Sequence, residues 1–194
     1  EVKDLTDENL TGISFQAYSG EILGVYGLLG SGHQNLGPAI YGQTICQAGE
    51  IFLNETKVTI RNPLDALKLG IAYVPAERKV EGLILGTTVR ENLMVSSYAR
   101  QSHYGLIDKK REQSVTEKWI QNLQIRAPSG ETKTEFLSGG NQQKVVLSKC
   151  LELEPSVLIL NEPTRGIDVG AKAEIYKILN DLCKNGKCII MVTS

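Results

Sequence analysis

A glycine-rich stretch at residues 27–34, GLLGSGHQ, has residue types that can hold a phosphate group. Its small residues are Gly27, Gly30, Ser31 and Gly32. Glycines let a ligand approach the backbone closely, and successive N–H groups before a helix can then point at an anion. A phosphate-binding loop continues with a lysine and then a serine or threonine, where this chain has His33 and Gln34. The alternative interpretation is a tight turn that packs a strand against a helix.

A second stretch, residues 137–144 with the sequence LSGGNQQK, is predicted to begin a helix. Ser138 is a typical N-terminal cap, and the two glycines after it leave backbone amides uncovered. The stretch is therefore a second candidate anion site, with a hydroxyl added, and an ordinary capped helix is the alternative. Its candidate contact residues are Leu137, Ser138, Gly139, Gly140 and Gln142.

An acidic residue follows an apolar run at residues 157–162, VLILNE. In α/β folds, ligands bind beyond the carboxyl ends of the buried parallel strands. Glu162 is therefore the candidate catalytic residue, as a general base or as a group that positions water. Asn161 stands where an aspartate that organises a metal is expected. Asp168 follows after a short turn.

Four apolar segments are predicted to be strands that position these groups, at residues 22–26, 71–75, 156–160 and 187–192. The last two are apolar on both faces, which is typical of strands covered on both sides by helices. Helical patterns follow at residues 62–70 and 170–184, and this alternation predicts an α/β fold with a parallel sheet. Residues 82–136 break the alternation, and we expect them to form a helical subdomain inserted into a single domain of residues 1–194.

The composition of the 194-residue chain excludes some classes of function. Its net charge of −1 indicates no polyanionic partner such as a nucleic acid. The longest apolar run is too short to cross a bilayer, and we expect neither a transmembrane segment nor a signal peptide. The four cysteines lack metal-ligand spacing and are interpreted as free thiols in a reducing compartment. We therefore expect a soluble intracellular domain.

Taken in order, these motifs resemble the nucleotide-binding domain of ABC transporters over nearly the whole chain. The Walker A loop, signature, Walker B strand and D-loop match residues 27–34, 137–144, 157–162 and 165–168. The runs IAYVPAERK and TRGIDVGAKAEIY resemble one subgroup. It is the second, C-terminal ATPase domain of bacterial simple-sugar importers of the ribose, galactose and xylose type. The resemblance implies a P-loop NTPase-like core, with ATP and Mg²⁺ as cofactors.

The same resemblance implies several partners. In this family two ATPase domains pair head to tail, and the signature of one closes over ATP held by the Walker motifs of the other. We expect a second ATPase domain N-terminal to this one in the same polypeptide, membrane permease subunits, and indirectly a periplasmic or lipoprotein sugar-binding protein. The expected location is the cytoplasmic face of the bacterial membrane, as a peripheral component without nucleic acid.

Three departures from the family pattern surround one phosphate position. His33 replaces the lysine that reaches the β- and γ-phosphates, Gln34 the hydroxyl that ligates magnesium, and Asn161 the Walker B aspartate. Gln34 and Asn161 can offer carbonyl oxygens, but a hard cation beside phosphates favours charged oxygen ligands. We therefore expect a weak or absent Mg²⁺ site here.

Further departures lie at the other family positions. Ala76 occupies the place of the Q-loop glutamine, unless the neighbouring Glu77 takes that role. Ser194 falls where the switch histidine is expected. Gly37 and Pro38 lie in the helix that should follow the Walker A loop, and both residues disfavour a helix interior, so we expect that helix to be bent, shortened or late in starting.

Three hypotheses follow from this combination. The first is a domain with little or no ATPase activity of its own, which donates an intact signature in trans to the partner's ATP and Mg²⁺. The second is a self-sufficient ATPase in which His33 replaces the lysine. The third is a non-transport ABC adaptor; an exposed apolar groove near residues 78–95 would favour transport instead.

Overall fold

The computed structural model describes residues 1–28, 30–98 and 108–194, and it divides the chain into two compact units. The first unit consists of Glu1–Pro75, Pro155–Pro163 and Leu179–Ser194. The second unit consists of Ala76–Glu154 and Thr164–Ile178. Leu29 in the glycine-rich loop, and residues 99–107 in the predicted helical subdomain, lie outside the described residues.

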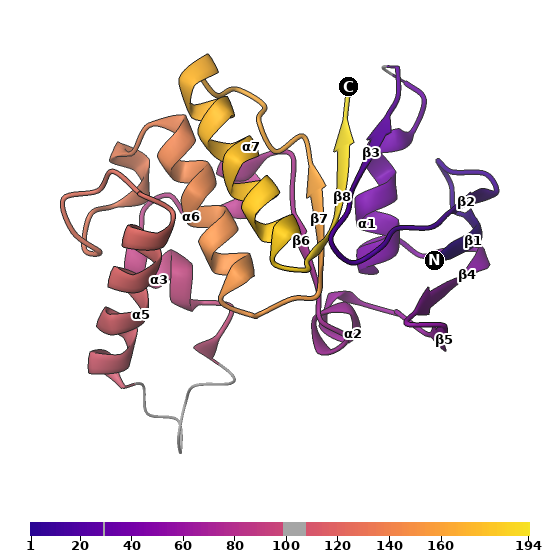
Figure 1. Cartoon of the computed structure of the whole chain (residues 1–194), viewed down its shortest axis with the longest axis horizontal. Coiled ribbons are helices and arrows are strands. Elements are labelled where there is room, and N and C mark those ends of the chain that lie inside the picture. The colour runs from indigo at the N-terminus through magenta and orange to yellow at the C-terminus, as the bar shows by residue number, and fades with distance from the viewer. Residues whose placement is uncertain (29, 99–107) are drawn as a thin grey trace. The chain divides into compact units, whose positions relative to one another are not determined.

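A parallel sheet forms the centre of the first unit. Its strands run in the order β3 (Ile22–Tyr26), β8 (Cys188–Thr193), β7 (Val157–Asn161) and β6 (Ile71–Val74), and Figure 1 shows β8 between β3 and β7. These are the four strands predicted from the apolar segments. Every residue of β6 is buried, as are all of β7 after its first residue, so continuous apolar runs mark the inner strands.

An antiparallel sheet completes the strands of the first unit, and the sequence reasoning did not predict it. Its order is β2 (Ile13–Phe15), β1 (Val2–Thr6), β4 (Ala48–Leu53) and β5 (Thr56–Val58). β4 and β5 are joined through Asn54 and Glu55, whose φ angles of 48° and 64° are those of a two-residue hairpin turn. An asparagine between two short β-rich segments was the signal available for this hairpin.

The helix after the glycine-rich loop begins late, as expected. A short 3₁₀ turn, η1 (His33–Asn35), precedes α1 (Leu36–Tyr41), so Pro38 is the third residue of the α-helix. N–H groups of the first turn have no partner within a helix, and a proline there removes no hydrogen bond. Gly37 lies against β6, since a Cβ on it would stand 2.6 Å from Cε2 of Tyr73. The first unit also contains α2 (Pro63–Lys68), capped by the Asn62 side chain.

The described part of the second unit is mainly helical. Its elements are η2 (Arg78–Gly82), α3 (Val89–Met94), α5 (Lys109–Asn122), η3 (Thr134–Phe136) and α6 (Gly139–Leu151). Thr88 and Glu91 form a capping box at the start of α3, and Ser138 caps α6. The α3 and α6 helices pack together through side chains that are fully buried, among them Leu93, Met94 and Val146. The last helix, α7 (Val169–Lys184), contributes residues to both units.

Candidate functional site

The glycine-rich loop has the backbone that its sequence requires. Gly30 and Gly32 have φ angles of 85° and 80°, in the left-handed region that favours glycine. A Cβ on Gly32 would stand 2.4 Å from the backbone oxygen of Asn9, so only glycine fits there. These contacts all lie within the first unit, and they hold the loop in a tight turn.

The side chain of His33 is folded into this loop. A Cβ on Gly27 would stand 2.5 Å from both Cγ and Nδ1 of His33 and 2.5 Å from Oγ of Ser31. His33 is only 8% exposed, and its Nδ1 shares a 2.8 Å hydrogen bond with the Ser31 hydroxyl. The backbone N–H of Ser31 donates to the Leu28 oxygen at 3.0 Å. The space above Gly27 is therefore filled by side chains of the loop itself.

Asn161 ties the end of β7 to the loop. Its Nδ2 donates to the backbone oxygen of Gln34 at 2.8 Å and to the hydroxyl of Tyr73 at 3.3 Å. Because the Gln34 carbonyl can only accept, the amide nitrogen of Asn161 must face it. The other amide atom, Oδ1, is buried and has no hydrogen-bond partner in the described part of the chain.

The donor set around Asn161 does not fit a strongly held Mg²⁺. The Gln34 backbone oxygen is already bonded to Asn161, and both Oδ1 of Asn161 and the side-chain oxygen of Gln34 are neutral amide oxygens. Hard divalent cations in proteins favour carboxylate oxygens. Within residues 1–28, 30–98 and 108–194, no cluster of three or more histidine, cysteine, aspartate or glutamate side chains could hold a metal ion. We derive no chemical step through a metal at this position.

Glu162 and Ser194, predicted separately as catalytic residue and switch position, lie together in the first unit. The Ser194 hydroxyl donates to Oε1 of Glu162 at 2.6 Å. Glu162 has a φ of 47°, and its backbone N–H donates to the Val192 oxygen at 2.9 Å. A glutamate in the left-handed region is uncommon, and such backbone strain concentrates at functional sites. This carboxylate is half-buried and is held from two sides.

The signature stretch forms the start of α6 in the second unit. The Ser138 hydroxyl accepts from the backbone N–H of Asn141 at 3.5 Å and from its Nδ2 at 2.9 Å. Ser138 is exposed, Gly139 is half-buried and Gly140 is buried. A Cβ on Gly140 would stand 2.5 Å from Cβ of Ala171, so that glycine allows α6 and α7 to pack closely.

The other two signature residues lie in the interior of the second unit. Leu137 is buried, and Gln142 is 3% exposed. Nε2 of Gln142 donates to the backbone oxygen of Thr134 at 3.0 Å, which fixes the turn that precedes the signature. Of the predicted contact residues, Ser138 is therefore exposed and Gly139 half-buried, whereas the other three are buried.

Asp168 shares a pocket with the signature. Oδ1 of Asp168 accepts from the backbone N–H of Ala171 at 2.9 Å and so caps the first turn of α7. A pocket of about 180 Å³ is lined by Arg126, Ser138, Gly140, Asn141, Asp168, Gly170, Ala171 and Glu174. The starts of α6 and α7 therefore open onto one polar pocket, within one unit.

The predicted Q-loop position lies next to an ion pair. Ala76 and Glu77 both belong to the second unit, and Oε1 of Glu77 forms a 2.6 Å ion pair with Nη1 of Arg165. The adjacent Arg78 donates to the backbone oxygens of Arg165 and Gly166, at 2.6 and 3.1 Å. Sequence reasoning did not single out Arg78, although the run PAERK drew attention to its neighbours.

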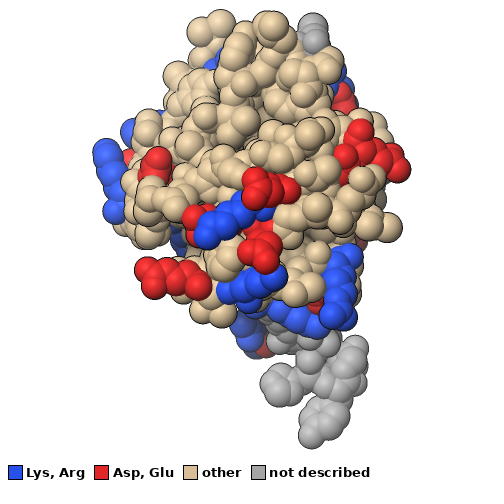
Figure 2. Space-filling view, turned by 90° about the vertical axis from the view of Figure 1, so that its right-hand side faces the viewer, with Lys and Arg blue, Asp and Glu red and all other residues tan. Residues whose placement is uncertain are grey.

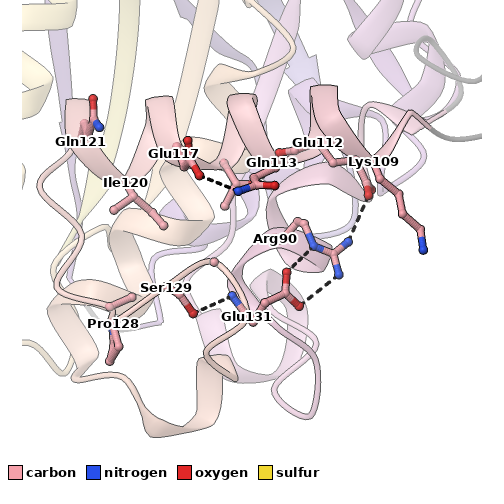
Figure 3. Close-up of a pocket in the computed structure, with 13 residues that line it drawn as sticks. Arg90, Lys109, Glu112, Gln113, Glu117, Ile120, Gln121, Pro128, Ser129 and Glu131 are labelled. Atoms are coloured by element: carbon pink, nitrogen blue, oxygen red, sulfur yellow. Dashed lines mark hydrogen bonds and ion pairs between the residues drawn. The ribbon is translucent and has the colours of Figure 1, made fainter.

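A further pocket, of about 540 Å³, lies between α5 and residues 127–131 and contains none of the predicted site residues. Figure 3 shows the guanidinium of Arg90 between two carboxylates, with Glu131 paired at 2.7 Å and Glu112 at 3.1 Å. This ion-pair arrangement joins the start of α3, α5 and the loop before η3. It raises the pKa of Arg90, first through the bond to Glu131.

The surface carries charges of both signs. On the face drawn in Figure 2, lysine and arginine side chains are interspersed with aspartate and glutamate, and the upper part of that face is largely uncharged. Over the described residues, no helix is long and apolar enough to span a bilayer.

Comparison with known proteins agrees with this geometry. A family model described as ABC transporter matches residues 10–165. The chain is 47% identical over 182 residues to the ribose import ATP-binding protein RbsA of Bacillus licheniformis, covering 94% of this chain and 37% of that protein. It is 46% identical over 196 residues to the protein of the same name from Clostridium perfringens strain 13, covering 100% and 39%. The chain thus spans less than half of these relatives.

Solved structures show the same fold at low sequence identity. A nucleotide-free ATP-binding cassette from an ABC transporter superposes with a TM-score of 0.83 at 21% identity, covering 100% of this chain and 80% of that one. A dimeric cassette bound to ADP and Pi gives 0.80 at 20% identity, covering 99% and 86%. The fold, the order of motifs and the family match lead to one conclusion. The chain belongs to the ABC transporter family, as an ATP-binding domain homologous to the ribose import ATP-binding proteins.

Proposed function

We propose that the chain is one of two ATPase domains in an importer of simple sugars, and that it donates its signature to ATP bound by the other domain. Its own Walker site contributes little or no hydrolysis. The share of 37% that the chain covers in a ribose import relative supports a second domain in the same polypeptide. In this proposal, residues 1–194 form one ATPase domain, and residues 82–136, approximately, form its helical subdomain.

The contrast between the two anion sites is the observation that carries the proposal. In the first unit, His33 and Ser31 fill the space above Gly27, and Asn161 occupies the carbonyl of Gln34. In the second unit, Ser138 and Gly139 are accessible at the start of a 13-residue helix, whose N-terminus favours an anion. The first arrangement disfavours ATP with Mg²⁺, whereas the second can contact a phosphate presented by a partner.

The proposal assigns roles to the remaining family positions. ATP and most of the Mg²⁺ are bound by the Walker motifs of the partner domain. Glu162 and Ser194 stand at the places of the catalytic carboxylate and the switch residue, but the neighbouring loop gives them no well-held nucleotide. Asp168 shapes the pocket beside Ser138 through its cap on α7.

An exposed apolar surface on the second unit supports a transport role over an adaptor. Val80, Ile84 and Val95 are 81%, 54% and 42% exposed, within the segment of residues 78–95 where an exposed apolar groove would favour transport. Large exposed apolar patches mark interaction sites, and these three side chains are the candidate for one here. We infer that this surface contacts membrane permease subunits at the cytoplasmic face of the membrane, and that a periplasmic or lipoprotein sugar-binding protein acts through those permeases.

The test compares two serine-to-arginine variants in the full-length protein assembled with its transport partners. Ser138→Arg places bulk and charge at the start of α6, and we expect it to abolish ATP hydrolysis and sugar uptake. Ser129→Arg is the matched control, because Ser129 is an exposed serine of the same unit outside the signature. Normal hydrolysis in Ser138→Arg, or an equal loss in both variants, would overturn the proposal.

A further inference from the structure

Arg78 joins segments of the second unit that are distant in sequence. Its three donor bonds are Nη1 to the Arg165 oxygen at 2.6 Å, Nη2 to the Gly166 oxygen at 3.1 Å, and Nε to Oε1 of Gln142 at 3.4 Å. The first two acceptors belong to the turn before Asp168, and the third belongs to α6. One planar guanidinium thus holds the D-loop turn against the signature helix.

The surroundings of Arg78 are shaped for this fork. A Cβ on Gly139 would stand 2.7 Å from Nη2 of Arg78, so a side chain at this third signature position would displace the guanidinium. Gly166 has a φ of 64°, in the left-handed region, and in this turn the successive carbonyls of Arg165 and Gly166 both accept from Arg78. A lysine has one nitrogen on a flexible stem and cannot reproduce a planar fork.

The electrostatics argue against a role in packing alone. Burial lowers the pKa of the Arg78 guanidinium, so the position costs solvation of a charge. A cation beside the N-terminus of α6 is also unfavourable for the helix dipole. Both costs are offset by the carbonyls of Arg165 and Gly166, and a phosphate brought to Gly139 would reduce the second cost further.

The turn that carries Arg78 is anchored on its inner side. Lys149 donates its ammonium to the backbone oxygen of Gly82, and a Cβ on Gly82 would stand 3.1 Å from Cγ2 of Val146. Val80, two residues before Gly82, faces solvent. The guanidinium therefore sits on a fixed base, which is what a group that positions two other segments requires.

We propose that Arg78 is a positioning residue of the signature, which fixes the turn at residues 165–168 relative to Ser138 and Gly139. This inference rests on the proposed function for its effect on hydrolysis. The Walker motifs of the partner supply most of the nucleotide affinity, and the signature acts when the two domains close. Loss of the fork should therefore lower kcat and leave KM for ATP nearly unchanged.

The test pairs Arg78→Lys with Arg90→Lys in the full-length protein. Arg90 is the matched control because its guanidinium also bonds two partners in the second unit, far from the signature in sequence and function. We expect Arg78→Lys to lower kcat about tenfold to a hundredfold, as small misplacements of catalytic groups do. Arg90→Lys should keep kcat and KM near those of the unmodified protein.

A second readout, without nucleotide, separates this inference from the proposed function. Hydrogen exchange of peptides covering residues 164–178 reports the cap between Asp168 and Ala171. In Arg78→Lys we expect faster exchange there, by about tenfold for one lost hydrogen bond, and no change in Arg90→Lys. Unchanged exchange in Arg78→Lys would overturn the inference, whatever the transporter does.

The kinetic outcomes are also distinguishable. Faster exchange and a normal kcat in Arg78→Lys, in a transporter that Ser138→Arg inactivates, would overturn the positioning role in hydrolysis. Faster exchange in Arg78→Lys, in a transporter that tolerates Ser138→Arg, would support the structural role of the Arg78 fork and contradict the proposed function instead. A fall in kcat with KM unchanged, together with faster exchange, supports both.

Discussion

Ser194 donates its hydroxyl to Oε1 of Glu162 at 2.6 Å, while the backbone of Glu162 is held in the left-handed region at a φ of 47°. The proposed catalytic carboxylate is thus held by a hydrogen bond from a neutral hydroxyl, not by an ion pair with a cationic side chain. In the glycine-rich loop of the same unit, the side chains of Ser31 and His33 fill the space above Gly27.

We expect the isolated chain to release phosphate from ATP at the background rate. Glu162→Gln should not change that rate, because the proposed function leaves no nucleotide with Mg²⁺ where Glu162 could act. A phosphate-release assay on the two proteins checks this. A turnover near the enzyme median of about 10 per second, lost in Glu162→Gln, would support the self-sufficient ATPase instead.

A second prediction concerns the imidazole of His33. Its removal in His33→Ala should expose backbone N–H groups of the loop, and we expect the chain to bind metal-free ATP about tenfold more tightly, the effect of roughly one charged hydrogen bond. Calorimetric titration measures this, with Ser31→Ala as the control that keeps the imidazole. Weaker binding by His33→Ala would mean that the imidazole contacts the phosphates directly.

The third prediction concerns packing between α1 and the parallel sheet. Gly37→Ala places a Cβ 2.6 Å from Cε2 of Tyr73, and we expect a loss of about 1–3 kcal/mol in the free energy of unfolding from overpacking. Gly86→Ala, where a Cβ meets nothing within 4 Å, should be neutral or slightly stabilising. Urea unfolding of both variants decides, and equal stability would refute the close contact.

The fourth prediction is a pH dependence of stability. The hydrogen bond from Lys144, which is buried, lowers the pKa of Glu174 below its ordinary value of 4.5. This contribution to stability is present above the unfolded carboxylate's pKa and is lost as the pH falls through the lower folded value. Glu174→Gln should therefore destabilise the chain at pH 7 and lose that effect in the acid range below about 4.5.

Urea unfolding at several pH values measures this difference. Glu131→Gln is a useful comparison, since bonding to Arg90 also lowers the pKa of Glu131 but Glu131 lies at a different site. A difference between Glu174→Gln and the unmodified chain that stays constant down to strongly acid pH would contradict the ion pair with Lys144.

The parallel sheet could be predicted because its inner strands are continuous apolar runs, such as residues 157–161. The antiparallel sheet could not, because β2 and β5 have three residues each and β1 is interrupted by Asp4 at a φ of 49°. Short, irregular strands are stabilised by the strands they pair with, and the hydrophobic pattern of the sequence does not show which strands those are.

The candidate site divides in the same way. Caps such as Ser138 are local, so their roles follow from a few neighbouring residues. The inward turn of His33 and the fork of Arg78 depend on residues brought together by the fold, including Gly27 beside the imidazole and Gly166 beside the guanidinium. The type and spacing of residues therefore predict where the candidate anion sites lie, but not which of their side chains face a ligand.

The late start of α1 bears on whether the Walker site could be repaired. His33→Lys alone would place an ammonium on a 3₁₀ turn, in a loop whose next carbonyl is bonded to Asn161 and whose α-helix begins only at Leu36. We therefore expect that recovery of hydrolysis at the proposed inactive site requires simultaneous changes at several positions. On that proposal, directed evolution for ATPase activity in this domain faces a barrier that no single substitution crosses.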